Sequence, residues 1–191
     1  MSKRQQYDDD LVAISGLPPG QWGLSAVNVI LKTCQPISGY PNLLDFGCGT
    51  GHAGPHLNKA GWKETLHGCD LSDGMLQVAA SRNSYTKLIK STFDDSHAQA
   101  GFYHVIHASG IFAPGQAPPS ALDEFLKLLQ VGGMAVFTMR KEYYEGPEGA
   151  AHKQHLEELC DQRRWELVSQ TQDVYLPKDN VTCFVFCMKK F

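Results

Sequence analysis

The chain has 191 residues, with 17 lysines and arginines against 20 aspartates and glutamates and a formal net charge of −3. This length allows one domain with a sizeable core, and it argues against a cofactor domain joined to a separate catalytic domain. The charge balance offers no footprint for nucleic acid or an anionic membrane. No apolar run reaches the roughly 18 to 20 residues of a membrane span. We therefore expect a soluble, cytoplasmic protein with neither kind of partner.

The six cysteines contain no C-x-x-C pair, which argues against a disulfide framework or a zinc site. Two histidine pairs with a spacing of three also do not suggest a metal. His104 and His107 lie on a predicted strand, where this spacing places them on opposite faces, and His152 and His155 lack a nearby third ligand. We expect no metal and mostly buried, reduced cysteines.

Apolar periodicity and turn residues predict strands that alternate with helices, followed by a terminal hairpin. The pattern indicates an α/β fold with a mostly parallel seven-stranded sheet, a C-terminal antiparallel hairpin and helices on both faces. We expect a single domain over residues 1–191, with a helical cap over 1–36 and the core over 37–191. Strands are predicted over residues 42–46, 65–69, 87–90, 103–108, 134–139, 165–174 and 181–188. Helices are predicted over residues 21–34, 52–60, 73–82, 121–129 and 152–164.

Residues 109–120 are predicted to be a loop, because they hold three prolines and two glycines. A loop of this length is more than a simple connection in a compact domain. It is therefore the first candidate for a lid that faces a substrate.

Three glycines, Gly47, Gly49 and Gly51, follow the first predicted strand and remove side chains where backbone N–H groups can approach a ligand. Residues 49–54 also satisfy the G-x-G-x-x-G pattern of dinucleotide binders, which is a weak signal alone. Asp70 follows the second predicted strand, 19 positions after Gly51, which is the separation expected of a carboxylate that binds ribose hydroxyls. The loop thus predicts a nucleotide-type cofactor.

The segment Asp45-Phe46-Gly47-Cys48-Gly49-Thr50-Gly51 resembles motif I of the class I S-adenosylmethionine-dependent methyltransferases, and Asp70-Leu71-Ser72-Asp73-Gly74-Met75-Leu76 resembles the motif after their second strand. Residues 102–106 and 128–133 match two further segments in the same order. A narrower resemblance, over 115–121 and 137–140, is to the methyltransferase-like proteins of the Williams-Beuren chromosomal region. These likenesses imply a Rossmann-like methyltransferase fold.

The resemblance implies S-adenosylmethionine as the cofactor and methyl transfer to a small-molecule or small exposed acceptor. Asp45 would hold the methionine moiety and Asp70 the ribose, since a carboxylate at the strand end suits the cofactor's cationic amino group better than a nicotinamide site. The remaining expected cofactor contacts surround the glycine loop, the adenine and the strand ends. They are Gly47, Cys48, Gly49, Gly51, Leu71, Met75, Thr92, Phe93 and His107.

Candidates for catalysis lie near the carboxyl end of the fourth predicted strand and just after the fifth. His107 has the chemistry of a general base, and Tyr143 can lie over a sulfonium or serve catalysis. Arg140 is either a receptor for a substrate carboxylate or a member of an ordinary ion pair. Two alternatives stay open: a module that binds S-adenosylmethionine without catalysis, as a sensor or protein partner, and, less favoured, a nicotinamide enzyme.

Overall fold

The structure is a computed structural model that describes residues 24–34, 42–63, 65–91, 100–176 and 180–191. Of the predicted N-terminal cap, only 24–34 lies in the described part. There, helix α2 (Ser25–Thr33) occupies most of the predicted helix and packs Ala26, Val27 and Ile30 inward. The rest of the cap and the predicted turn over 177–179 lie outside the described residues.

Seven strands form one sheet in the order β3-β2-β1-β4-β5-β7-β6. The first five strands are parallel, and β7 runs antiparallel between β5 and β6. This confirms the predicted Rossmann-like methyltransferase fold with its C-terminal antiparallel hairpin. The strands are β1 (Leu43–Phe46), β2 (Leu66–Asp70), β3 (Lys87–Lys90), β4 (Tyr103–Phe112), β5 (Leu129–Arg140), β6 (Trp165–Leu176) and β7 (Val181–Lys190).

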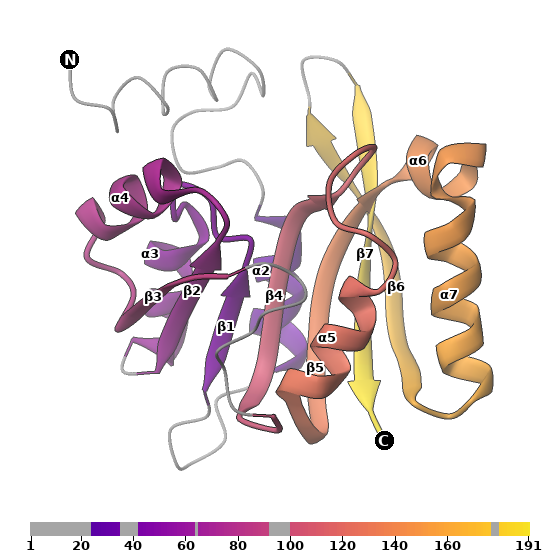
Figure 1. The fold of residues 1–191 in the computed structure, drawn as a ribbon, viewed down its shortest axis with the longest axis horizontal. Coiled ribbons are helices and arrows are strands. Elements are labelled where there is room, and N and C mark those ends of the chain that lie inside the picture. Colours follow the sequence, from indigo (N-terminus) through magenta and orange to yellow (C-terminus); the bar gives the residue numbers. More distant parts are fainter. Residues whose placement is uncertain (1–23, 35–41, 64, 92–99, 177–179) are drawn as a thin grey trace.

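Helices cover both faces of the sheet (Figure 1). One apolar cluster joins the sheet to α2 and α3, and a second joins the opposite face to α5 and α7. The short α6 leads from β5 towards α7. The remaining helices are α3 (Ala53–Leu57), α4 (Asp73–Ser81), α5 (Ala121–Leu128), α6 (Lys141–Glu145) and α7 (Ala150–Asp161).

Alternation along β1 sets which side chains meet which helices. Leu44 and Phe46 belong to the cluster on the α5 face, whereas Leu43 belongs to the cluster on the α2 face. Since successive strand residues point to opposite faces, Asp45 lies on the α2 face. The pairing of Asp45 with His107 on β4 puts both side chains on that face. On the α2 face, the apolar pair of Leu43 and Val105 is therefore followed, two residues further along the strands, by the polar pair of Asp45 and His107.

Gly132 and Gly133 lie inside a strand, although the sequence placed them between a helix and a strand. Gly132 and Gly133 were expected to end a helix before the strand, but β5 begins at Leu129 and runs through both. Pairing of Leu129 with Tyr103 on β4 holds this start in the sheet, and Gly132, with a φ of +78°, accommodates an irregularity in the register. In the same way β4 continues to Phe112, so the predicted loop starts four residues later.

The strand order places a switch point between β1 and β4. The chain goes from β1 to β2 and β3 on one side, and from β4 to β5 on the other. Connections leave the carboxyl ends of β1 and β4 in opposite directions, which opens a crevice where ligands bind in open α/β sheets. The glycine loop and the segment after β4 border this crevice.

Candidate functional site

A cavity of about 490 Å³ lies at the carboxyl ends of β1, β2 and β4, within the size range of small-molecule sites. Five of the predicted cofactor residues line it. They come from the glycine loop, the end of β2 and the start of α4: Gly47, Gly49, Asp70, Leu71 and Met75.

The glycine loop needs its glycines for two different reasons. Gly47 and Gly49 both have positive φ values, +70° and +54°, which side chains disfavour. A Cβ on Gly47 would clash with the side chain of Ile111, whereas a Cβ on Gly49 would meet no atom within 4 Å. Gly49 thus borders open space at the pocket. This is the kind of close backbone approach that a ligand requires.

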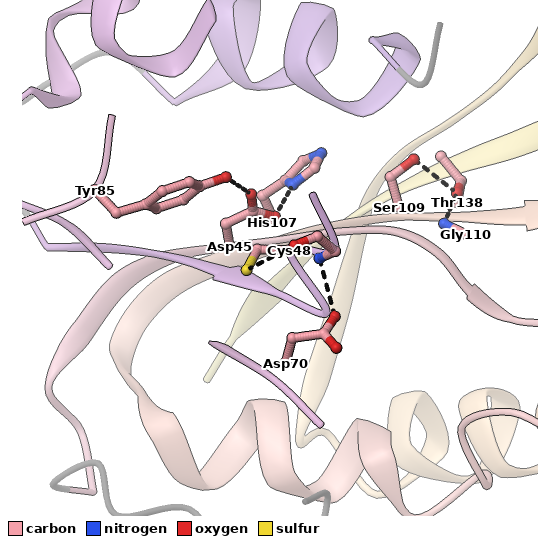
Figure 2. Close-up of polar contacts among 9 residues, drawn as sticks. Asp45, Cys48, Asp70, Tyr85, His107, Ser109, Gly110 and Thr138 are labelled. Atoms are coloured by element: carbon pink, nitrogen blue, oxygen red, sulfur yellow. Dashed lines mark hydrogen bonds and ion pairs between the residues drawn. The ribbon is translucent and has the colours of Figure 1, made fainter. Parts of the chain in front are cut away.

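Asp70 ties the end of β2 to the glycine loop. One of its oxygens, Oδ2, accepts a hydrogen bond from the backbone N–H of Gly49 at 2.9 Å (Figure 2). The other, Oδ1, accepts one from the N–H of Ser72 at 2.9 Å. A carboxylate has about four acceptor positions, so lone pairs remain for two further donors. Ser72 also caps α4 by accepting from the N–H of Met75.

Asp45 is buried and has partners inside the protein. Its Oδ1 lies 2.7 Å from Nδ1 of His107, and its Oδ2 accepts a hydrogen bond from the Tyr85 hydroxyl at 2.6 Å (Figure 2). Burial and the neighbouring Asp45 carboxylate hold the pKa of Tyr85 well above its usual value, so the phenol stays a donor. Neither Asp45 nor His107 is among the residues that line the pocket.

His107 is only 2% exposed, and within the described residues its Nε2 has no hydrogen-bond partner. In the tautomer whose Nδ1 donates to the carboxylate of Asp45, the lone pair of the ring lies on Nε2. An unpaired buried polar atom is costly, at about 1–3 kcal/mol. Atoms of this kind in folded proteins call for an explanation such as a ligand or a catalytic role.

Two other predicted cofactor contacts, Cys48 and Gly51, contact other parts of the protein and do not face the pocket. Cys48 donates its backbone N–H to the carbonyl of Cys69 at 2.8 Å, and burial raises the pKa of its thiol. A Cβ on Gly51 would come within 2.9 Å of the Tyr85 ring and 3.1 Å of Ala79, so this glycine permits close packing against α4. Neither residue lines the pocket. Thr92 and Phe93 lie outside the described residues.

Tyr143 lies away from the pocket, on α6. Its side chain is 7% exposed, and its hydroxyl lies 3.1 Å from Nδ1 of His152 on α7. The other ring nitrogen of His152 donates to the carbonyl of Ala117 at 2.9 Å. Ala117 does line the pocket, so this contact chain connects α6 and α7 with the pocket wall.

The end of β4 and the segment after it contribute pocket residues that were not among the predicted cofactor contacts. The predicted loop over 109–120 was expected to face a substrate. Which of its residues reach the pocket depends on where β4 ends, at Phe112. Tyr85 was also missed, because nothing local distinguishes it from other aromatic residues near a turn. The pocket residues from the end of β4 are Ser109, Gly110 and Ile111, and those from the segment after it are Gly115, Gln116 and Ala117.

Comparison with known proteins bears on what this pocket is for. Residues 43–133, which contain the glycine loop and Asp70, match the family model described as a methyltransferase domain. Over these residues the chain is similar to that family. This match supports S-adenosylmethionine as the cofactor, as the sequence implied. A comparison with curated proteins finds no match.

Three solved structures share the fold of this chain at low sequence identity. A protein from Listeria monocytogenes, provisionally described as an S-adenosylmethionine-dependent methyltransferase, is 14% identical with a TM-score of 0.67, over 88% of this chain and 99% of that one. A methyltransferase of the same kind from Mesorhizobium loti is 14% identical with a TM-score of 0.66, over 87% and 98%. Geranyl diphosphate C-methyltransferase from Streptomyces coelicolor, solved with S-adenosylhomocysteine, is 15% identical with a TM-score of 0.62, over 87% and 76%.

Two searches within the described residues gave negative results. No helix in the described ranges is long and apolar enough to cross a membrane. Within those same ranges, no group of three or more histidine, cysteine, aspartate or glutamate side chains is arranged to hold a metal ion.

Proposed function

We propose that the chain is an S-adenosylmethionine-dependent methyltransferase that acts on a small-molecule acceptor or a small exposed group and releases S-adenosylhomocysteine. The observation that carries this proposal is Asp70, which lines the pocket and holds the N–H of Gly49 in the glycine loop. We also propose one domain over residues 1–191. The resemblance over 115–121 and 137–140 supports placement near the Williams-Beuren methyltransferase-like proteins.

The residues around the pocket fit the chemical parts of this cofactor. Asp70 retains acceptor positions for the two ribose hydroxyls, and the half-exposed Leu71 with Met75 offers an apolar surface for adenine. Gly47 and Gly49 leave room for the methionine moiety beside the backbone. When bound, the cofactor supplies a methyl group that its sulfonium already activates. The task of the chain is then to orient the acceptor and to exclude water.

We assign Asp45 a positioning role through His107. Both of its oxygens have partners, Tyr85 and His107, so the carboxylate fixes the ring that carries the unpaired Nε2. His107 is then the group that contacts the ligand, either as an acceptor for the cofactor's amino group or as a base for the methyl acceptor. We retain Tyr143 only as support for the pocket wall, because its hydroxyl contacts His152.

A binding module without catalysis is the second candidate. It is favoured by the position of the two predicted catalytic residues, His107 and Tyr143, neither of which lines the described pocket. Such a module would bind S-adenosylmethionine and S-adenosylhomocysteine with similar affinity, and it would release no S-adenosylhomocysteine when incubated with S-adenosylmethionine and a panel of acceptors.

The proposal is tested by isothermal titration calorimetry of the full chain with S-adenosylhomocysteine and with NAD. We expect S-adenosylhomocysteine to bind and Asp70→Ala to weaken it at least about tenfold, since hydrogen bonds to a charged group contribute about 1.5–3 kcal/mol. The matched control is Asp73→Asn, because Asp73 pairs with Lys90 at 2.6 Å outside the pocket. This variant should bind S-adenosylhomocysteine as the wild type does.

The same titration applied to His107→Gln separates the two roles of that residue. If Nε2 contacts the cofactor's amino group, the variant loses affinity for S-adenosylhomocysteine but not for 5′-methylthioadenosine, which lacks the amino-acid part. If His107 serves the acceptor, both affinities stay and turnover falls. Absence of S-adenosylhomocysteine binding by the wild type, or tighter binding of NAD, contradicts the proposed function.

A further inference from the structure

Polar side chains on the α2 face of β5 adjoin two residues that line the pocket. We call Thr138, Arg140 and Tyr175 the Arg140 cluster. Thr138 and Arg140 are two residues apart on β5 and therefore share a face. The hydroxyl of Thr138 accepts from the backbone N–H of Gly110 at 3.1 Å and lies 3.4 Å from the hydroxyl of Ser109 (Figure 2). Both β4 residues line the pocket.

Arg140 is the charged member of this cluster. It is exposed at the carboxyl end of β5, and its guanidinium lies 5.8 Å from the centre of the Tyr175 ring. The sequence left an ordinary ion pair as one interpretation of this residue. Within the described residues, Arg140 makes no ion pair.

The charged neighbours of Arg140 have other partners. Lys141 lies 3.9 Å from Glu145 and over the ring of Phe184. Asp173 shares a row of the sheet with Arg140, through Cys183 between them, but its carboxylate accepts from the N–H of Val174 at 2.8 Å. The guanidinium is thus held by an aromatic face and keeps its N–H donors available.

Tyr175 connects Arg140 with the pocket wall. A Cβ on Gly110 would come within 2.6 Å of the Tyr175 hydroxyl, and Gly110 has a φ of +78°. The Tyr175 ring therefore reaches from the guanidinium of Arg140 to a residue that borders the pocket. Burial raises the pKa of Tyr175, so its hydroxyl remains a donor beside the cation.

We propose that Arg140 binds an anionic group of the methyl acceptor, a carboxylate or a phosphate, and that Tyr175 holds the guanidinium in place. This inference rests on the proposed methyltransferase function and adds the substrate class. The planar guanidinium offers paired donors that match both kinds of anion. Its place at the carboxyl end of β5 is the edge of the sheet where ligands bind in this class of fold.

The test is calorimetry on the full chain saturated with S-adenosylhomocysteine, with benzoate, phenyl phosphate and benzamide as probes. The three probes share a ring and differ in the head group, so they distinguish a carboxylate, a phosphate and a neutral group. We expect one of the two anions to bind, benzamide to bind at least tenfold more weakly, and Arg140→Gln to weaken the anion at least tenfold. Arg140→Lys should restore part of the affinity.

The matched control is Lys141→Gln, which removes a neighbouring positive charge and should change the anion's affinity less than twofold. Equal losses of affinity for the anion in Lys141→Gln and Arg140→Gln would overturn the inference, because they would indicate a nonspecific effect of positive charge instead of a contact with Arg140. Equal binding of benzamide and the anions, or no anion binding while S-adenosylhomocysteine binds, would also overturn it. If the wild type does not bind S-adenosylhomocysteine, the result would instead contradict the proposed function.

Discussion

Gly47 and Gly49 lie two residues apart in one loop, yet their surroundings differ. Gly47 packs against Ile111, whereas Gly49 faces open space at the pocket. The sequence pattern treats the two alike, because it records only the absence of a side chain. Their different roles allow the packing of the loop to be separated from its ligand contacts by experiment.

We predict that Gly49→Ala mainly affects ligand binding. An alanine with the positive φ of residue 49 costs about 1–2 kcal/mol of folding stability. The added methyl group enters the open space at the pocket and should lower the affinity for S-adenosylhomocysteine at least tenfold. Gly47→Ala should instead lower the free energy of unfolding by about 2–4 kcal/mol, since strain and overpacking add. Urea denaturation and calorimetry measure the two effects. Wild-type affinity in folded Gly49→Ala would contradict this role.

At the scale of elements, α6 and α7 are coupled to the pocket through His152. This buried ring bridges the hydroxyl of Tyr143 and the carbonyl of Ala117. Burial lowers the pKa of His152, although the hydrogen bond to the Ala117 carbonyl opposes the shift. The folded protein therefore binds a proton at this site less readily than the unfolded chain does.

This difference predicts a loss of stability in mild acid. The unfolded chain takes up protons as the pH falls through the ordinary histidine value of about 6.5, and the folded state does so only at lower pH. The free energy of unfolding should thus fall as the pH drops below about 6.5. The loss should be smaller in His152→Gln. It should not vanish, because burial also lowers the pKa of His67.

Urea denaturation at pH 7.5, 6.5 and 5.5, compared between the wild type and His152→Gln, measures the slope. An identical slope in the two proteins would show that His152 does not contribute to it. The variant should also be less stable at pH 7.5, by about 1–3 kcal/mol, because the amide does not reproduce the position of the ring between its two partners, Tyr143 and Ala117.

Element boundaries were predicted well where signals are local. The strands at β1, β2 and β3 agree with the prediction within a residue, because a short apolar run is bounded by polar or glycine residues. The extension of β5 through Gly132 and Gly133 was not predicted. Those glycines look like a break in isolation, but pairing with β4 continues the strand.

At the scale of the whole molecule, the pocket draws on β1, β2, β4 and the segment before α5. A ligand bound there contacts parts of the chain from residue 46 to residue 117. Since unfolding separates these parts, ligand binding should be strongly linked to global stability.

We therefore predict a thermal shift on ligand binding. At 100 times its dissociation constant, S-adenosylhomocysteine should raise the free energy of unfolding by about 2.7 kcal/mol. For a chain of this length, that corresponds to an increase of roughly 5–11 °C in Tm. Differential scanning fluorimetry measures the shift. NAD at the same concentration should give none, and an equal shift with NAD would contradict a site specific for the adenosyl ligand.

The sequence by itself determined the fold class, the glycine loop and the place of Asp70. These features depend on contacts within one strand, loop and helix unit, where a spacing in the chain is nearly a distance in space. It also indicated that Arg140 lies at the carboxyl end of a strand, whereas His107, predicted near such an end, lies in the middle of β4.

Only the tertiary structure decided which partners these side chains have. Asp45 meets Tyr85 and His107, which are 40 and 62 residues away, and Arg140 meets Tyr175 on an antiparallel strand added at the edge of the sheet. Such meetings depend on strand order and register. Those are set by the packing of the whole sheet, and a local pattern does not encode them.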